Sequence, residues 1–181
     1  GTEKQGLSLV PSFGYIGDNK ADDHEELRGL QDIDWTGEVG LRVNYVAGPS
    51  TSYGAVRLGI GGHDGVVGEI GTKYRFTVND RLTLWTGAEL QLGDDSFTDT
   101  YFGVTGAESA ASGMRAYDPS GGIYAANISL EARYSLSPDT AILGKVSYGR
   151  LLDDAGNSPV VSDRNQPKIN LGIARRLNFR F

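Results

Sequence analysis

Hydrophobic and polar residues alternate along most of this chain with a period of two. In the final segment, KINLGIARRLNFRF, Ile169 and Leu171 fall on one side of an extended strand and Asn170 on the other, because successive side chains of a strand point to opposite faces. Seven earlier segments repeat the pattern. We therefore predict eight strands, at residues 7–16, 33–46, 52–61, 66–78, 82–93, 123–136, 140–150 and 168–181.

The connections between these segments alternate between short and long. The short turns are rich in Gly, Pro, Asn, Asp and Ser and lie at 47–52, 78–81 and 135–140. The long loops lie at 17–32, 94–122 and 152–168, and GHDGV (62–66) is intermediate. This asymmetry is typical of bacterial outer-membrane barrels, whose turns face the periplasm and whose long loops face outward. Both ends of the strand series then fall on the short-turn side.

Alternation by itself fits two architectures. In a soluble eight-stranded barrel the apolar face points inward around a ligand, whereas in a membrane barrel it faces lipid and the polar face lines the lumen. Most segments reach the ~9–11 residues that a tilted strand needs to cross a bilayer. No segment keeps a 3.6-residue period, so helix is a minor component, although ESAASG (108–113) favours a short helical turn.

The polar face favours the membrane architecture, because it carries charges of both signs on single strands, such as Glu131 with Arg133. Small barrels fill their interior with side chains, so these charges can pair there. Trp85, which is bulky and lies on the polar face, also indicates a filled lumen. The predicted lumen charge network comprises Glu38, Arg42, Arg57, Glu69, Lys73, Arg75, Glu89, Glu131, Arg133, Lys145 and Arg176.

Aromatic residues of the apolar face gather toward the strand ends. Two belts of amphipathic rings are expected at the two interfaces of a membrane. The predicted girdles comprise Trp35, Tyr45, Tyr74, Phe76, Tyr124, Tyr134, Tyr148, Phe179 and Phe181. Arg175 is an exception, because it falls on the apolar face roughly mid-strand, where exposure to lipid would cost about 2–4 kcal/mol. We predict an all-β, antiparallel, up-and-down transmembrane β-barrel.

The amino-acid composition excludes several classes of function and site but does not by itself identify the function. The 181 residues fit a single domain, 1–181, whose opening residues 1–6 are typical of a processed or engineered start. The 17 basic and 23 acidic residues give a net charge of -6, which argues against a nucleic-acid partner. The chain has no cysteine, which excludes disulfides and thiolate sites. No stretch approaches the ~18 apolar residues of a membrane-spanning helix.

Four stretches carry a more specific pattern. They are DTYFGVTGAESAASGMRAYDPSGGI (99–123), LRGLQDIDWTGEVG (27–40), GGHDGVVGEIGTKYRF (61–76) and YGRLLDDAGNSPVVSDRNQPKINLGIARR (148–176). Together they resemble the MipA/OmpV family of outer-membrane proteins, the MltA-interacting proteins. Members of that family carry additional strands before the point matching Leu7, so the resemblance implies a barrel of eight strands, or of ten or twelve with upstream strands.

The resemblance implies a location in the outer membrane of a Gram-negative bacterium and a scaffold role that links a murein transglycosylase to a murein synthase. A small-solute porin or uptake channel, or a surface adhesin, is the alternative that it leaves open. The expected partners are outer-membrane lipid, lipopolysaccharide and the barrel assembly machinery, because the C-terminal Phe181 resembles the signal which that machinery reads.

Candidate chemistry is sparse, and we expect no enzyme activity, no cofactor and no metal. His63 with Asp64 could act as base and orienter beside a loop serine (Ser96, Ser109 or Ser112), although GGHDG also fits a tight glycine turn. His24 lies in an acidic loop. The acidic pairs Asp94–Asp95 and Asp153–Asp154 offer oxygen ligands for divalent ions, but a solvated rim is the simpler interpretation.

Overall fold

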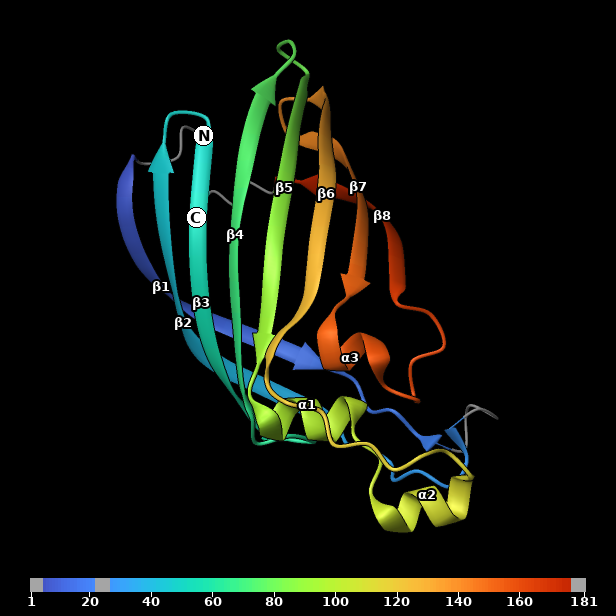
Figure 1. Ribbon diagram of the computed structural model, residues 1–181. Coiled ribbons are helices and arrows are strands. Elements are labelled where there is room, and N and C mark those ends of the chain that lie inside the picture. The colour runs from blue at the N-terminus through green and yellow to red at the C-terminus, as the bar shows by residue number, and fades with distance from the viewer. Residues whose placement is uncertain (1–4, 22–26, 177–181) are drawn as a thin grey trace, which may run out of the picture.

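The computed structural model describes residues 5–21 and 27–176, and they form one antiparallel sheet with three short helices (Figure 1). Each strand pairs with its neighbours in sequence, in the order β1 to β8. The strands are β1 (Gly6–Ile16), β2 (Thr36–Ala47), β3 (Ser50–Gly61), β4 (Val66–Thr77), β5 (Leu82–Gly93), β6 (Gly122–Ser137), β7 (Thr140–Leu151) and β8 (Asn165–Arg175). The helices are α1 (Asp95–Phe102), α2 (Gly106–Ser112) and α3 (Asp153–Asn157).

The antiparallel eight-strand arrangement predicted from the sequence is confirmed for these residues, and the helical turn predicted at 108–113 corresponds to α2. Each predicted strand that the structure describes at both ends begins and ends within three residues of the observed one. Within the described ranges, the pairing of strands does not join β1 to β8. None of the helices in those ranges has the length and apolar character needed to span a membrane.

The ladder is continuous from β1 to β8, with register shifts only between Gln91 and Leu92 and between Ser135 and Ser137 in the part of the chain that the structure describes. Residues directly paired in an antiparallel ladder point to the same face, so each row of pairs shows what one face carries. One such row crosses every strand and consists of Ser8, Asn44, Tyr53, Gly71, Glu89, Asn127, Gly149 and Gln166. This face, which we call the polar face, is therefore polar from one edge of the sheet to the other.

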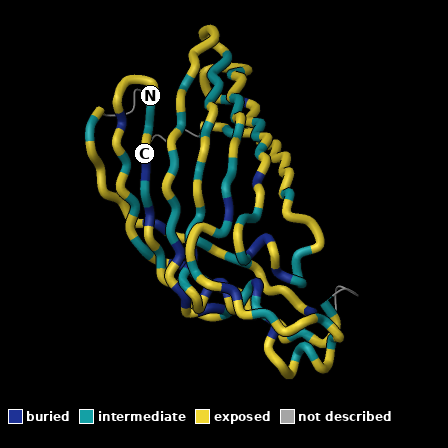
Figure 2. The backbone as a smooth tube through the Cα atoms, viewed as in Figure 1, coloured by how far each residue is buried: buried dark blue, intermediate teal, exposed yellow. Residues whose placement is uncertain are grey.

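The opposite face, which we call the apolar face, is the exposed one. Leu41, Ile70, Ile128 and Leu171 are 56%, 57%, 61% and 82% exposed, whereas the carboxylate residue Glu38 is only 8% exposed. A water-soluble barrel would show the reverse, with these aliphatic side chains inside. Figure 2 shows that exposed residues run along the strands, while buried residues gather mainly where the sheet meets the helices.

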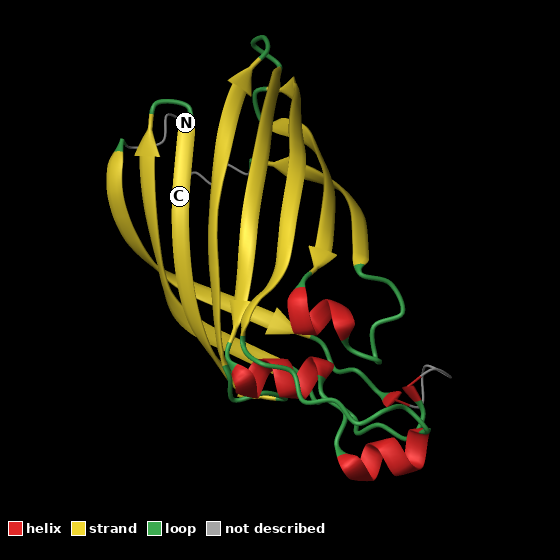
Figure 3. Ribbon diagram, in the orientation of Figure 1, coloured by secondary structure: helices red, strands yellow, loops and turns green. Residues whose placement is uncertain are grey.

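The two ends of the sheet differ in construction. Short turns close one end and the helices cover the other, as Figures 1 and 3 show. At the short-turn end, Gly48 adopts the left-handed conformation (φ 60°) that the β2–β3 hairpin requires. In the β4–β5 turn, the Asn79 side chain accepts hydrogen bonds from the backbone N–H groups of Arg81 and Leu82, both at 2.9 Å. Side-chain hydrogen bonds of this type are what make Asn favourable in turns.

At the helical end, α1 is preceded by the capping residue Asp94, whose carboxylate accepts hydrogen bonds from the backbone N–H groups of Phe97 (2.9 Å) and of Val66 in β4 (2.8 Å). The capping residue thus satisfies a free N–H group of the first helical turn and also fixes the helix to the sheet. Phe97 and Phe102 then pack with Val67 and Ala155 in the main buried hydrophobic cluster. This cluster places α1 and α3 against the polar face of the sheet.

Candidate functional site

The most elaborate polar structure lies on the polar face, next to the helices. Arg57 donates hydrogen bonds to Glu38 (2.8 Å), to Glu69 (3.1 Å) and to the hydroxyl of Ser12 (3.2 Å). Arg42 forms an ion pair with the other oxygen of Glu69. These residues come from β1, β2, β3 and β4, so the network, which we call the loop-end network, ties four strands together.

The loop-end network continues through an aromatic residue. The Arg42 guanidinium lies 3.8 Å from the centroid of the Tyr53 ring, a cation–π contact. The Tyr53 hydroxyl donates a hydrogen bond to Glu89 at 2.6 Å, and the Gln91 amide donates to the same carboxylate at 3.1 Å. Each carboxylate here has a donor within reach, as burial of charge requires.

His63 is the most buried titratable side chain of the site, with none of its side chain exposed. Its Nδ1 accepts a hydrogen bond from the Gly65 N–H (3.1 Å), and its backbone N–H donates to the Thr36 hydroxyl (3.1 Å). Because Nδ1 accepts, the neutral ring carries its proton on Nε2. That atom lies 3.5 Å from Glu38 Oε1 and makes no hydrogen bond within the described chain.

The structure does not assemble the catalytic arrangement considered for His63. The rings of Phe97 and Tyr101 pack edge-on against His63, with centroids 5.1 and 5.6 Å away. Ser109 and Ser112 instead donate hydrogen bonds to carbonyl groups of their own loop, those of Met114 and Glu108. Across residues 5–21 and 27–176 no serine hydroxyl is hydrogen-bonded to His63. His24 lies outside the described residues.

A β-bulge in β6 explains one departure from the predicted girdles. The register of β5 and β6 shifts between Gln91 and Leu92, which leaves Tyr124 as an extra residue. Its ring packs 4.9 Å from Phe97 and 6.0 Å from Phe102, inside the aromatic cluster. Tyr124 therefore does not lie on the apolar face, because a bulge moves a side chain to the other side of the sheet.

The other described members of the predicted girdles lie on the apolar face and are 42–56% exposed: Trp35, Tyr45, Tyr74, Phe76, Tyr134 and Tyr148. Phe179 and Phe181 lie outside the described residues. The position of Arg175 differs from the expectation of a mid-strand cation, because it is the last residue of β8 and pairs with Thr140 at the start of β7. It therefore sits beside the short turn.

The predicted lumen charges separate into two groups. Glu38, Arg42, Arg57 and Glu69 meet in the loop-end network, and Glu89 joins them through Tyr53. Nearer the short turns, Glu131 Oε1 lies 2.9 Å from Lys73 Nζ and 3.1 Å from Lys145 Nζ.

The remaining predicted charges stay apart from both groups. Arg75 and Arg133 make no ion pair within the described residues. Arg176 lies beyond β8 and donates its backbone N–H to Asp139. Sequence reasoning did not include Ser12, Tyr53 and Tyr101 in the network. The period of two could have indicated Ser12 and Tyr53, which lie on the polar side of their strands, but not Tyr101, which lies in α1.

The acidic pairs of the loops order the loops themselves. Asp95 accepts a hydrogen bond from the Gly121 N–H (2.6 Å), and Asp154 accepts one from the Ser120 N–H (3.0 Å). Burial, together with the negative charges of Asp118 and Asp95, raises the pKa of Asp99 above its ordinary value. Among the described residues no three His, Cys, Asp or Glu side chains come together in a metal-binding group.

Comparison of the sequence with known proteins identifies the family to which it is similar. The family model described as MltA-interacting protein MipA matches residues 2–177. The "MltA-interacting protein" of Escherichia coli K12 is 30% identical over 177 residues, which cover 95% of this chain and 68% of that protein. The protein of the same name from Shigella flexneri matches equally well. "Putative outer membrane protein YiaT" of Escherichia coli O157:H7 is 25% identical over 167 residues, covering 91% of this chain and 67% of that protein.

Proposed function

Because the chain belongs to the MltA-interacting protein MipA family, we propose that it is an outer-membrane scaffold protein of a Gram-negative bacterium. In this proposal the sheet is the wall of an up-and-down transmembrane β-barrel, of eight strands or of ten or twelve with upstream strands. The apolar face contacts lipid and the polar face lines the lumen. Relatives described as outer membrane proteins support the location.

The distribution of exposed side chains supports the membrane orientation. Large aliphatic and aromatic residues of every strand lie on the apolar face, many of them more than half exposed. In water, each such side chain would forgo about 1.5–3 kcal/mol of burial energy. Hydrocarbon removes that cost, and it also explains why the charged groups gather on the polar face.

We expect a substitution on the apolar face to test this orientation. Ile128→Arg would place a cation against the middle of the bilayer and cost about 2–4 kcal/mol. The matched control is Asn127→Arg, because Asn127 is adjacent but lies on the polar face, where it is paired with Glu89. Urea unfolding in lipid vesicles measures both variants. Equal destabilisation of the two would contradict the proposed orientation.

The scaffold function is a proposal about the short-turn end. Two relatives are named for an interaction with MltA, and we propose that this chain likewise binds a murein transglycosylase. The periplasmic end is formed by the three hairpin turns between β2 and β3, β4 and β5, and β6 and β7. A standard interface buries ~1,200–2,000 Å² in total, so binding would need all three turns together.

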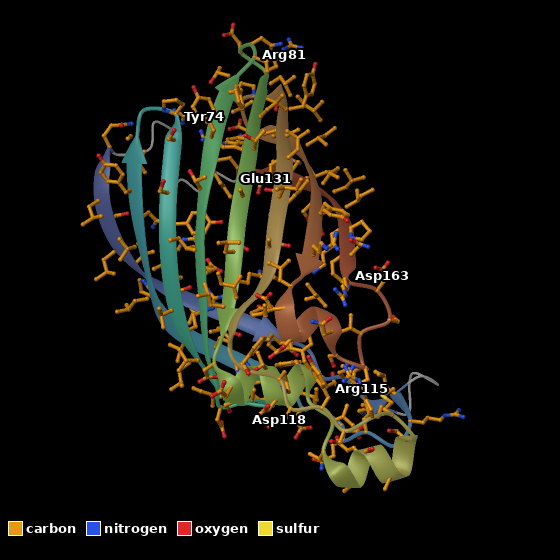
Figure 4. The ribbon with its side chains drawn as sticks, in the orientation of Figure 1. Tyr74, Arg81, Arg115, Asp118, Glu131 and Asp163 are labelled. Carbon is orange, nitrogen blue, oxygen red and sulfur yellow. The ribbon has the colours of Figure 1, made fainter. Side chains whose placement is uncertain are left out.

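A capture experiment tests this interface. The detergent-solubilised chain is immobilised and exposed to a purified murein transglycosylase, with and without the substitutions Asp80→Ala, Arg81→Ala and Asp139→Ala in the turns. We expect these substitutions to reduce capture at least tenfold. Substitution of Arg115 and Asp118 to alanine at the helical end (Figure 4) is the control and should leave capture unchanged. Capture that depends on the helical end instead would refute the assignment of the interface.

A channel is the second candidate, and one observation favours it. The polar face encloses a cavity of about 430 Å³ lined by charged and polar side chains, among them Glu89, Asn127 and Lys168. Conductance across planar bilayers distinguishes the two candidates. Steady ion steps would support a channel, whereas a silent bilayer with the protein inserted would support a filled lumen.

A further inference from the structure

The cavity of the polar face has a floor of small residues and a rim of lysines. Its central row of paired residues runs from β4 to β8 and consists of Lys73, Gly87, Ser129, Ser147 and Lys168. Lys145 lies in the next row toward the short turns, paired with Glu131 and Asn170. The three lysines and the two serines all line the cavity of about 430 Å³.

Positive charge is in excess in this part of the cavity. Lys73 and Lys145 share a single carboxylate oxygen, that of Glu131, at 2.9 and 3.1 Å. Lys168 makes no ion pair or hydrogen bond to any described residue. Three ammonium groups therefore face one carboxylate at this end, and the cavity keeps a surplus of one positive charge after Glu89 is counted. At the opposite end of the cavity, Glu69 is paired with Arg42 and Arg57, whereas Glu89 accepts hydrogen bonds from the uncharged Tyr53 and Gln91.

The floor offers hydrogen-bond donors and space. The hydroxyl groups of Ser129 and Ser147 make no hydrogen bond within the described ranges, and a hydroxyl group can donate to an anion. Gly87 leaves space in the cavity beside Ser129, because a Cβ at position 87 would approach the Ser129 hydroxyl to 3.0 Å. Ammonium and hydroxyl donors around an open space are the groups that bind phosphate and carboxylate oxygens, through charge-assisted hydrogen bonds.

We propose that Lys73, Lys145, Lys168, Ser129 and Ser147, which we call the lysine cradle, bind the phosphate or carboxylate group of a small anionic solute. The cavity is large enough for a sugar-sized molecule. Figure 4 shows Glu131, which marks the cradle, between Arg81 at the short-turn end and Asp118 at the helical end. The solute would enter from the short turns, because α1 and the aromatic cluster cover the other end. This inference goes beyond the scaffold function and does not depend on a protein partner.

Intrinsic fluorescence gives a direct readout. The chain has two tryptophans, and Trp85 lies in the row of Glu131 and Lys145. Trp35→Phe therefore leaves Trp85 as the single reporter in the detergent-solubilised chain. We expect inorganic phosphate, glucose 6-phosphate and gluconate to change its emission in a saturable way, while neutral glucose does not. The phosphate and gluconate arms show which oxyanion is preferred. No response to any of the three anions, or an equal response to glucose, would overturn the proposal.

A lysine variant locates the site. Lys168→Gln removes a group without an internal partner, so the fold should be retained, and we expect affinity for the bound anion to fall about tenfold. Lys20→Gln, a lysine in the loop between β1 and β2 at the opposite end, is the charge-matched control and should bind as the parent does. Unchanged affinity in Lys168→Gln would overturn the cradle. Capture of a transglycosylase should be the same in both variants, so failure of either proposal is recognised separately.

Discussion

The loop-end network and the lysine cradle lie on the same face of the same sheet, yet they are built differently. In the loop-end network, Glu38 and Glu69 have side chains that are 6% and 12% exposed, and each has an arginine partner. In the cradle, Glu131 is 26% exposed and its lysine partners 34% and 42%. Pairing is complete where water is excluded, because an unpaired buried charge is costly. Where water enters, surplus charge is tolerated and is available to a ligand.

Removal of a carboxylate should lower the free energy of unfolding far more in the loop-end network than in the cradle, and this is the largest difference that we expect between the two regions. Glu38→Ala leaves His63 without its nearest carboxylate and Arg57 with Glu69 alone, so we expect a loss of about 3 kcal/mol in the free energy of unfolding. Glu131→Ala should cost less than about 1 kcal/mol, because the lysines it releases reach water. Urea unfolding in vesicles measures both. Equal losses would remove the distinction between the regions.

Replacing one glycine in each region by alanine should give a smaller difference in the free energy of unfolding. A methyl group at Gly59 would collide with the enclosed ring of His63, whereas at Gly87 it would meet the flexible Lys73 stem at 3.3 Å and the Ser129 hydroxyl at 3.0 Å. We expect Gly59→Ala to cost about 1–3 kcal/mol by overpacking and Gly87→Ala to cost clearly less. The comparison uses the same unfolding assay, and a greater loss in Gly87→Ala would show that the cradle is the more rigid region.

The smallest effect is expected in the loops, outside both regions. Burial acts to raise the pKa of Glu108, but hydrogen bonds from Thr105 and from the Gln31 backbone hold it below its ordinary value. A lowered folded-state pKa stabilises the fold above the unfolded-state pKa of about 4.3, and this contribution is lost as the pH falls through the folded-state value. The protection factors for amide exchange at Gln31 and Thr105, which correct for the intrinsic pH dependence of exchange, should therefore fall at acid pH. Glu108→Gln should remove that pH dependence, and its persistence in the variant would contradict this assignment.

Strand positions could be predicted because the two faces of each strand meet different surroundings. The predicted segment 82–93 is identical to β5, and 7–16 differs from β1 by one residue. By contrast, α1 has the sequence DSFTDTYF, in which the helical spacing of Phe97, Tyr101 and Phe102 extends over only eight residues and was not predicted as a helix. It forms because Asp94 caps its first turn and because Phe97 and Phe102 bury their rings on the sheet. The cap is local, but burial of the rings depends on Val67 and Ala155, which are distant in the sequence, so local pattern could not indicate it.

In the candidate site, too, the sequence pattern predicts which face a residue lies on but not which residues it contacts. Alternation placed Glu69, Lys73 and Glu131 on one face, and the strand pairing agrees. Alternation indicated that charges of both signs can pair in the lumen but not which ones meet: Glu131 pairs with Lys73 and Lys145 of other strands rather than with Arg133 of its own. Residues two apart on a strand are about 6.6 Å apart, whereas ladder partners are closer. Which strands supply those partners depends on the register.

The sequence by itself determined the strands, the two faces and the short and long connections, since each follows from a period of two and from local turn chemistry. Only the tertiary structure decided which charges meet, that a bulge turns Tyr124 toward the aromatic cluster, and that one end of the polar face is closed while the other keeps its lysines open. The physical reason is that burial and charge pairing are set by side chains brought together across strands. That arrangement is fixed by the register of the whole sheet and by the loops that fold over it.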